Sequence, residues 1–147
     1  MSSAKGHLFF GLLFALLFVF VASAIASNPT PLEIVLYIVI CLMFALWPDV
    51  DIKSVGQRLF YSLFFLTDVY LILNQQFKIA AYFGLIIILP VLARHRGWTH
   101  SRISMVLIPL PILIYPIYAQ GAINFSGLPY YLAAATGYYS HLLLDGR

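Results

Sequence analysis

The sequence predicts an all-α fold, a polytopic transmembrane helical bundle of about six short spans that forms one integral membrane domain, residues 1–147. Of the 147 residues, 63% are hydrophobic and only 9% are charged. A soluble protein of this composition would have too little polar surface to face water. A span takes about 20 residues, so five or six spans and their turns use nearly the whole length and leave no room for a soluble domain.

The first two spans are predicted to form a hairpin. Residues 7–27 are apolar, and a turn rich in asparagine and proline separates them from a second apolar run at 32–47. Pro48 ends this second run, because proline disfavours helix at the residue before it. Residues 1–26 also resemble a signal peptide, since Lys5 precedes an apolar stretch that ends in small residues. This alternative would remove the first span.

Four further apolar runs follow. They lie at about 58–74, 79–93, 103–119 and 128–145. Ser54 and Gln57 have the spacing of a capping box ahead of the third span. The fifth run contains three prolines, so we expect this helix to be kinked or partly broken.

The basic residues predict the orientation in the membrane. Only Lys78 falls on the opposite side of a six-span path from the other seven, which are Lys5, Lys53, Arg58, Arg94, Arg96, Arg102 and Arg147. Short loops that carry Lys and Arg stay in the cytoplasm. Both termini are therefore predicted to be cytoplasmic, in a plasma or inner membrane. The net charge of +3 comes from scattered residues and not from a basic run, so we expect no nucleic-acid partner.

Histidines and acidic residues gather on this same predicted side. All four histidines and three of the five acidic residues fall there, namely His7, Asp49, Asp51, His95, His100, His141 and Asp145. The orientation used only Lys and Arg, so this sorting is a separate observation. Ionisable groups near hydrocarbon are costly and usually mark a functional site or a paired structural feature.

Local spacings suit metal binding. Asp49 and Asp51 follow a proline in an irregular turn, where two carboxylates can approach one cation. His141 and Asp145 are four residues apart and share one helical face. Either pair taken alone is more often solvated or a helix cap than a ligand pair. Together they predict a shared site at one end of the bundle.

The densest polar segment is residues 94–101, which holds two histidines five positions apart. Gly97 gives it backbone freedom, and Thr99 is available as the N-cap of the fifth span. The alternative interpretation is a membrane anchor of arginines with Trp98 at the interface. Imidazole and carboxylate donors without thiolates suit Zn, Mn or Fe, and seven candidate ligands are enough for one or two divalent ions. Cys41, the only cysteine, lies in an apolar run and is expected to pack there.

Three motifs resemble those of the YdjM-like family of membrane-bound proteins, which are described as metal-dependent hydrolases. The motifs are Pro48–Asp51, His95–Ser101 and Gly137–Asp145, in this order. His7 with Gly11 is similar to the amino-terminal His-x-x-x-Gly element of that family. The resemblance implies a multi-span protein with a metal site built from these positions. Relatives usually continue beyond the aspartate that corresponds to Asp145.

Three functions are compatible with this sequence. The first is a membrane hydrolase that acts on a lipid-borne phosphate or ester, in which Asp49 and Arg96 are the predicted catalytic residues and Arg94 or Arg96 binds an anionic head group. The second is a non-catalytic subunit that packs against partner membrane subunits or further copies of itself and uses the cluster as a structural site. The third and weakest is an ion or metal transporter, because Asp68 is nearly the only polar group in mid-span.

Overall fold

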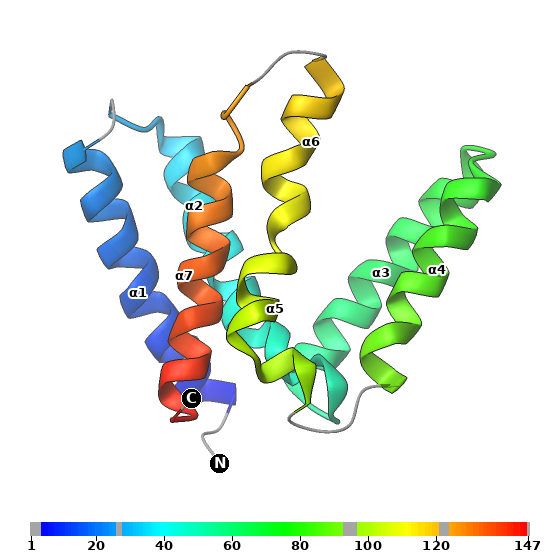
Figure 1. Ribbon diagram of the computed structural model, residues 1–147, viewed down its shortest axis with the longest axis horizontal. Coiled ribbons are helices and arrows are strands. Elements are labelled where there is room, and N and C mark those ends of the chain that lie inside the picture. Colours follow the sequence, from blue (N-terminus) through cyan, green and yellow to red (C-terminus); the bar gives the residue numbers. More distant parts are fainter. Residues whose placement is uncertain (1–3, 26–27, 93–96, 121–123, 147) are drawn as a thin grey trace.

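The computed structural model describes residues 4–25, 28–92, 97–120 and 124–146, and this part of the chain is helices joined by short turns (Figure 1). The predicted fold class, an all-α bundle, is confirmed. The elements are α1 (Ala4–Ile25), α2 (Pro31–Leu46), the 3-10 helix η1 (Trp47–Asp51), α3 (Val55–Leu73), α4 (Phe77–Leu92), the 3-10 helix η2 (Trp98–His100), α5 (Arg102–Leu107), α6 (Leu110–Gln120) and α7 (Leu128–Leu144).

Successive helical segments run in opposite directions, with α5 and α6 together forming one segment (Figure 1). The start of α1, the end of α7 and both 3-10 helices therefore lie at one end of the bundle, which we call the site end. Two stretches, Ala4–Ile25 and Pro31–Asp51, are long and apolar enough to cross a bilayer by length and composition. That every segment crosses the bilayer stays a prediction.

Helices α1, α2 and α7 form the tightly packed part of the bundle, because small residues face one another where they cross. A Cβ atom added to Gly11 would lie 2.7 Å from the Cβ of Ala45. A Cβ on Gly137 would overlap the backbone carbonyl of Cys41. Cys41 itself is fully buried against α1, with Sγ 3.7 Å from the Gly11 carbonyl oxygen, which agrees with the packing role expected for it. Small residues at such crossings are how membrane helices approach closely.

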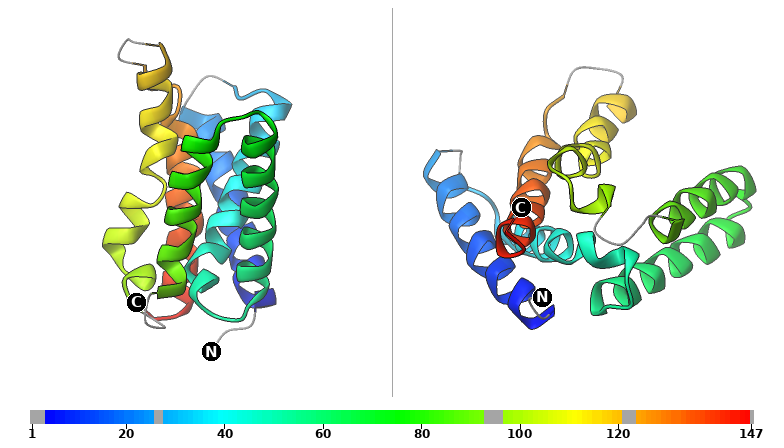
Figure 2. Two further views of the ribbon diagram at one scale, coloured as in Figure 1. Left: turned by 90° about the vertical axis from the view of Figure 1, so that its right-hand side faces the viewer. Right: turned by 60° about the horizontal axis from the view of Figure 1, so that its bottom comes forward.

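The α3–α4 hairpin leans away from these three helices and joins them at the site end (Figure 2). There Leu46, Val50 and Phe60 form a buried apolar cluster. The ring of Trp47 meets that of Phe60 edge-on, with centroids 4.7 Å apart. This cluster holds η1, which contains Asp49 and Asp51, between α2 and α3.

Local sequence signals predicted some of the helix boundaries correctly and others not, and the turn at Asp49 and Asp51, predicted to be irregular, is the 3-10 helix η1. Ser54 is the N-cap of α3 and accepts a hydrogen bond from the Gln57 backbone at 2.9 Å, which is one of the two hydrogen bonds of the expected capping box. The predicted break in the fifth span is also found, between α5 and α6 beside Pro109. The prediction that Thr99 is the N-cap of the fifth span was wrong. Ser101 caps α5 by accepting from the Ser104 backbone at 3.1 Å, because the Thr99 hydroxyl is already bonded within η2 and to η1.

Replacing Gly137 by alanine should destabilise the bundle, because the added methyl group meets the backbone of α2, which cannot move aside as a flexible side chain would. Overpacking of this kind costs about 1–3 kcal/mol or more. Thermal unfolding in detergent measures the effect. Gly84→Ala is the matched control, since a Cβ there has nothing within 4 Å. Equal melting temperatures for the two variants would contradict the close contact.

Candidate metal centre

Five ionisable side chains from four elements meet at the site end. His7 comes from the first turns of α1, Asp49 from η1, His100 from η2, and His141 and Asp145 from the end of α7. The three imidazoles are buried, with exposed fractions of 3% or less. The long-range packing of α1, α2 and α7 therefore brings together groups that are far apart in the sequence.

Four of the five side chains form a closed ring of alternating nitrogen and oxygen donors. His100 Nε2 is 3.6 Å from Asp49 Oδ1, which is 3.7 Å from His141 Nε2. His141 Nε2 is 3.6 Å from Asp145 Oδ2, and that oxygen is 3.7 Å from His100 Nε2. We call these four atoms the donor ring. The separations are too long for direct hydrogen bonds.

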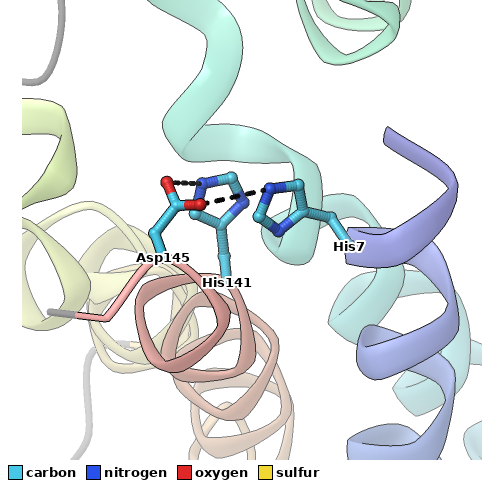
Figure 3. A group of neighbouring side chains, drawn as sticks. All are labelled: His7, His141 and Asp145. Atoms are coloured by element: carbon cyan, nitrogen blue, oxygen red, sulfur yellow. Dashed lines mark ion pairs between the residues drawn. The ribbon is translucent and has the colours of Figure 1, made fainter. Parts of the chain in front are cut away.

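His7 lies beside the donor ring. Its Nε2 is 3.6 Å from Asp145 Oδ1, so the two oxygens of Asp145 face different imidazoles (Figure 3). The ring of His7 also stacks on that of His141, with centroids 3.8 Å apart and planes within 10°. His7, His141 and Asp145 form one group able to hold a metal ion, and Asp49, His100 and His141 form another.

The residues present fit a divalent metal ion. Ligand atoms bound to one tetrahedral Zn at about 2.0–2.2 Å stand roughly 3.4 Å apart, close to the four separations of 3.6–3.7 Å between neighbouring atoms of the donor ring. His141 Nε2 is buried and makes no hydrogen bond with the part of the chain that is described. A buried polar atom left in this way is costly, and a cation beside it would remove that cost. The nitrogen and oxygen donors suit Zn, Mn or Fe.

One hydrogen bond fixes the tautomer of His141. Its Nδ1 lies 2.8 Å from the carbonyl oxygen of Ala45 at the end of α2. A carbonyl can only accept, so Nδ1 carries the proton and donates it. The lone pair of Nε2 then points into the donor ring, as in metal-binding histidines whose other nitrogen donates to the backbone.

The other predicted site residues are placed differently. Asp51 is not in either metal-binding group, and its Oδ2 accepts a hydrogen bond from the Thr99 hydroxyl at 3.1 Å. His95, Arg94 and Arg96 lie outside the described residues. Asp68 lies in the second half of α3, away from the site end, as expected.

Sequence reasoning missed two residues that hold the site together. Thr99 was interpreted as a helix cap, yet it contacts both Asp51 and His100. Tyr138 of α7 is fully buried and donates a hydrogen bond from its hydroxyl to the Thr99 carbonyl oxygen. The position of Thr99 next to a histidine was a signal, but its partners are 48 and 39 residues away and follow only from the fold.

The sequence profile of the family described as YdjM inner membrane protein matches residues 1–146. The chain belongs to this family. The resemblance carried by the three motifs is therefore confirmed, and so is the assignment to a family of inner membrane proteins, which agrees with the two long apolar helices. Searches of the curated proteins and of the solved structures give no match. Which side of the membrane the site end faces stays a prediction.

A divalent metal should stabilise the folded protein. Protein stripped with a chelator and melted in detergent should gain several degrees in melting temperature on addition of Zn or Mn, because an ion at 100 times its Kd contributes about 2.7 kcal/mol. His141→Ala should abolish the gain. Asp68→Asn, which changes an acidic residue away from the site end, should keep it. No gain for wild type with Zn, Mn or Fe would argue against a metal centre.

Proposed function

We propose that this chain is a membrane-embedded metal-dependent hydrolase that acts on a lipid-borne phosphate or ester. The observation that carries the proposal is the donor ring, in which nitrogen and oxygen atoms of His100, Asp49, His141 and Asp145 alternate at separations of 3.6–3.7 Å. These four residues would hold one divalent ion, and His7 is a further donor for it or for a second ion. A divalent ion supplies Lewis acidity, which activates water and polarises a phosphoryl or ester oxygen.

Access to such an ion would come from the carboxylate side. The side chains of Asp49 and Asp145 are 15% and 10% exposed, whereas those of His100 and His141 are at most 1% exposed. The imidazoles would therefore anchor the ion from within the bundle, and the carboxylates border the opening. Because Asp49 is the more exposed of the two, we assign it the role of orienting the attacking water and accepting its proton.

An apolar groove supports a lipid as the substrate. It has a volume of about 400 Å³ and is lined by residues of α1, α5 and α7, among them Phe14, Met105 and Tyr139. Helices α1 and α7 also carry His7 and His141, and α5 directly follows His100. A head group at the site end could thus have its acyl chain beside the same helices, within the hydrocarbon layer. Arg96 or Arg94 is proposed to bind the anionic head group, since guanidinium matches phosphate bidentately.

The second candidate is a non-catalytic membrane subunit. The feature that favours it is the deep burial of His7, His100 and His141, which ties α1, η2 and α7 together as a structural metal site would. Large exposed aromatics such as Phe65 and Tyr118 would then face partner membrane helices or a second copy. The two candidates differ in what the loss of one donor does to turnover and to stability.

Asp49→Asn should abolish turnover while most of the thermal stability of the metal-free protein remains, because Asp49 borders the opening and does not support the helix crossings. The assay uses protein in liposomes with Mn or Zn and a panel of phosphate and ester lipids of different head groups. Asp68→Asn is the matched control and should turn over like wild type. No turnover by wild type on any substrate, together with a large fall in melting temperature for His100→Ala, would favour the structural subunit.

Arg96→Ala should raise KM for anionic lipids about 10-fold to 100-fold, because a hydrogen bond to a charged group contributes about 1.5–3 kcal/mol. Neutral ester lipids should be affected much less. Arg58→Ala removes a basic residue from the first turn of α3 and serves as the control. Equal KM values for anionic and neutral substrates in Arg96→Ala would contradict a role of this guanidinium in head-group binding.

A further inference from the structure

Two hydrogen bonds join Asp51 of η1 to His100 of η2 through one hydroxyl group. The Thr99 Oγ1 atom lies 3.1 Å from Asp51 Oδ2 and 3.2 Å from His100 Nδ1. Thr99 is fully buried and His100 is 3% exposed. The Asp51 carboxylate is thus connected to the imidazole without touching the donor ring, which His100 enters through its other nitrogen.

The direction of both hydrogen bonds follows from the chemistry of the Asp51 carboxylate. An ionised carboxylate can only accept, so the single hydroxyl proton of Thr99 is donated to Asp51. The Thr99 oxygen then has only lone pairs to offer His100, so His100 Nδ1 must carry a proton and donate it. In the neutral imidazole, which is the form that binds a metal, Nε2 of His100 then has no proton and its lone pair faces Asp49 and Asp145.

Thr99 is itself held in place from α7. Tyr138, which is fully buried, donates its hydroxyl proton to the Thr99 carbonyl oxygen. Thr99 is therefore fixed by η1 through its side chain and by α7 through its backbone. His141 reaches the same tautomer more directly, by donating Nδ1–H to the Ala45 carbonyl oxygen.

We propose that Thr99 and Asp51 are positioning residues, which set the tautomer and the orientation of His100 for metal binding, and that Asp51 is not itself a ligand. The importance of this for metal affinity rests on the proposed metal-dependent function. The assignment differs from the sequence-based prediction, which placed Asp51 among the ligands. Partners of this kind in metal sites typically change the metal affinity about 10-fold to 100-fold.

The tautomer can be measured without any metal. Nitrogen NMR of histidine-labelled, metal-free protein in detergent distinguishes an Nδ1–H imidazole from an Nε2–H one, and His100→Asn identifies the His100 signals. Wild type and Thr99→Ser should have the proton on Nδ1. Thr99→Val keeps the shape of the side chain but lacks the hydroxyl, so the proton should move to Nε2. Ser140→Ala, which removes a buried hydroxyl that donates to the Gly137 carbonyl oxygen of the same helix, should leave the His100 signals unchanged.

Metal affinity gives the second measurement, by titration with Co²⁺ followed in its visible absorption bands. Thr99→Val and Asp51→Leu should each weaken binding about 10-fold to 100-fold. The double variant should be no weaker than the worse single variant, because both changes break the same connection. Thr99→Ser should restore binding, and Ser140→Ala should bind as wild type does.

The outcomes separate this proposal from the proposed function. Unchanged His100 signals and Co²⁺ affinity in Thr99→Val would overturn the positioning role even if wild type binds metal tightly. Losses that add in the double variant would overturn it too, because Asp51 would then act on the ion independently of Thr99. Absence of Co²⁺ binding by wild type would defeat the metal-dependent function, and with it the claim about affinity, while the tautomer measurement still decides the hydrogen-bond arrangement.

Discussion

The contact on which the rest of the structure depends is the crossing of α7 over α2, where Gly137 lies directly against the Cys41 carbonyl. One turn further along α7, the same close approach brings His141 within hydrogen-bonding distance of the Ala45 carbonyl. Gly11 allows α1 a similar approach to Ala45. Dispersion contacts dominate the association of membrane helices, since lipid and apolar side chains are equally hydrophobic. The small residues therefore determine how closely the site residues can converge.

Convergence of this kind has an electrostatic cost that helps to explain the site. Two carboxylates, Asp49 and Asp145, share a small volume with three buried imidazoles. Neutral imidazoles cannot balance two negative charges, and like charges at close range in a poorly solvated place repel strongly. A divalent cation would balance both carboxylates and satisfy the buried Nε2 of His141. The same argument applies to a catalytic and to a structural ion, so charge alone does not distinguish the two functions.

The two histidines of the donor ring, His100 and His141, are held in place by different hydrogen bonds. His141 uses a backbone carbonyl of the neighbouring helix, which is fixed as soon as α2 and α7 pack. His100 lies in the short helix η2, and the side chains of Thr99 and Asp51 take the place of a backbone acceptor. A side-chain connection can be lost by one substitution without any change in the helix packing. The position of His100 is for this reason more sensitive to single substitutions than that of His141.

The sequence by itself determined the class of the protein, the helical segments and the end of the bundle where the site lies. Composition requires a membrane fold, Pro109 breaks the fifth segment because it lacks a backbone donor, and alternation of the segments places His7, His100 and His141 at one end. These conclusions need only local chemistry and the direction of each helix. The tertiary structure decided which donors face one another: Asp49 and Asp145 enter the ring, whereas Asp51 bonds to Thr99. Helical spacing cannot reveal this, because it depends on how far α7 can approach α2 and on where η1 and η2 meet.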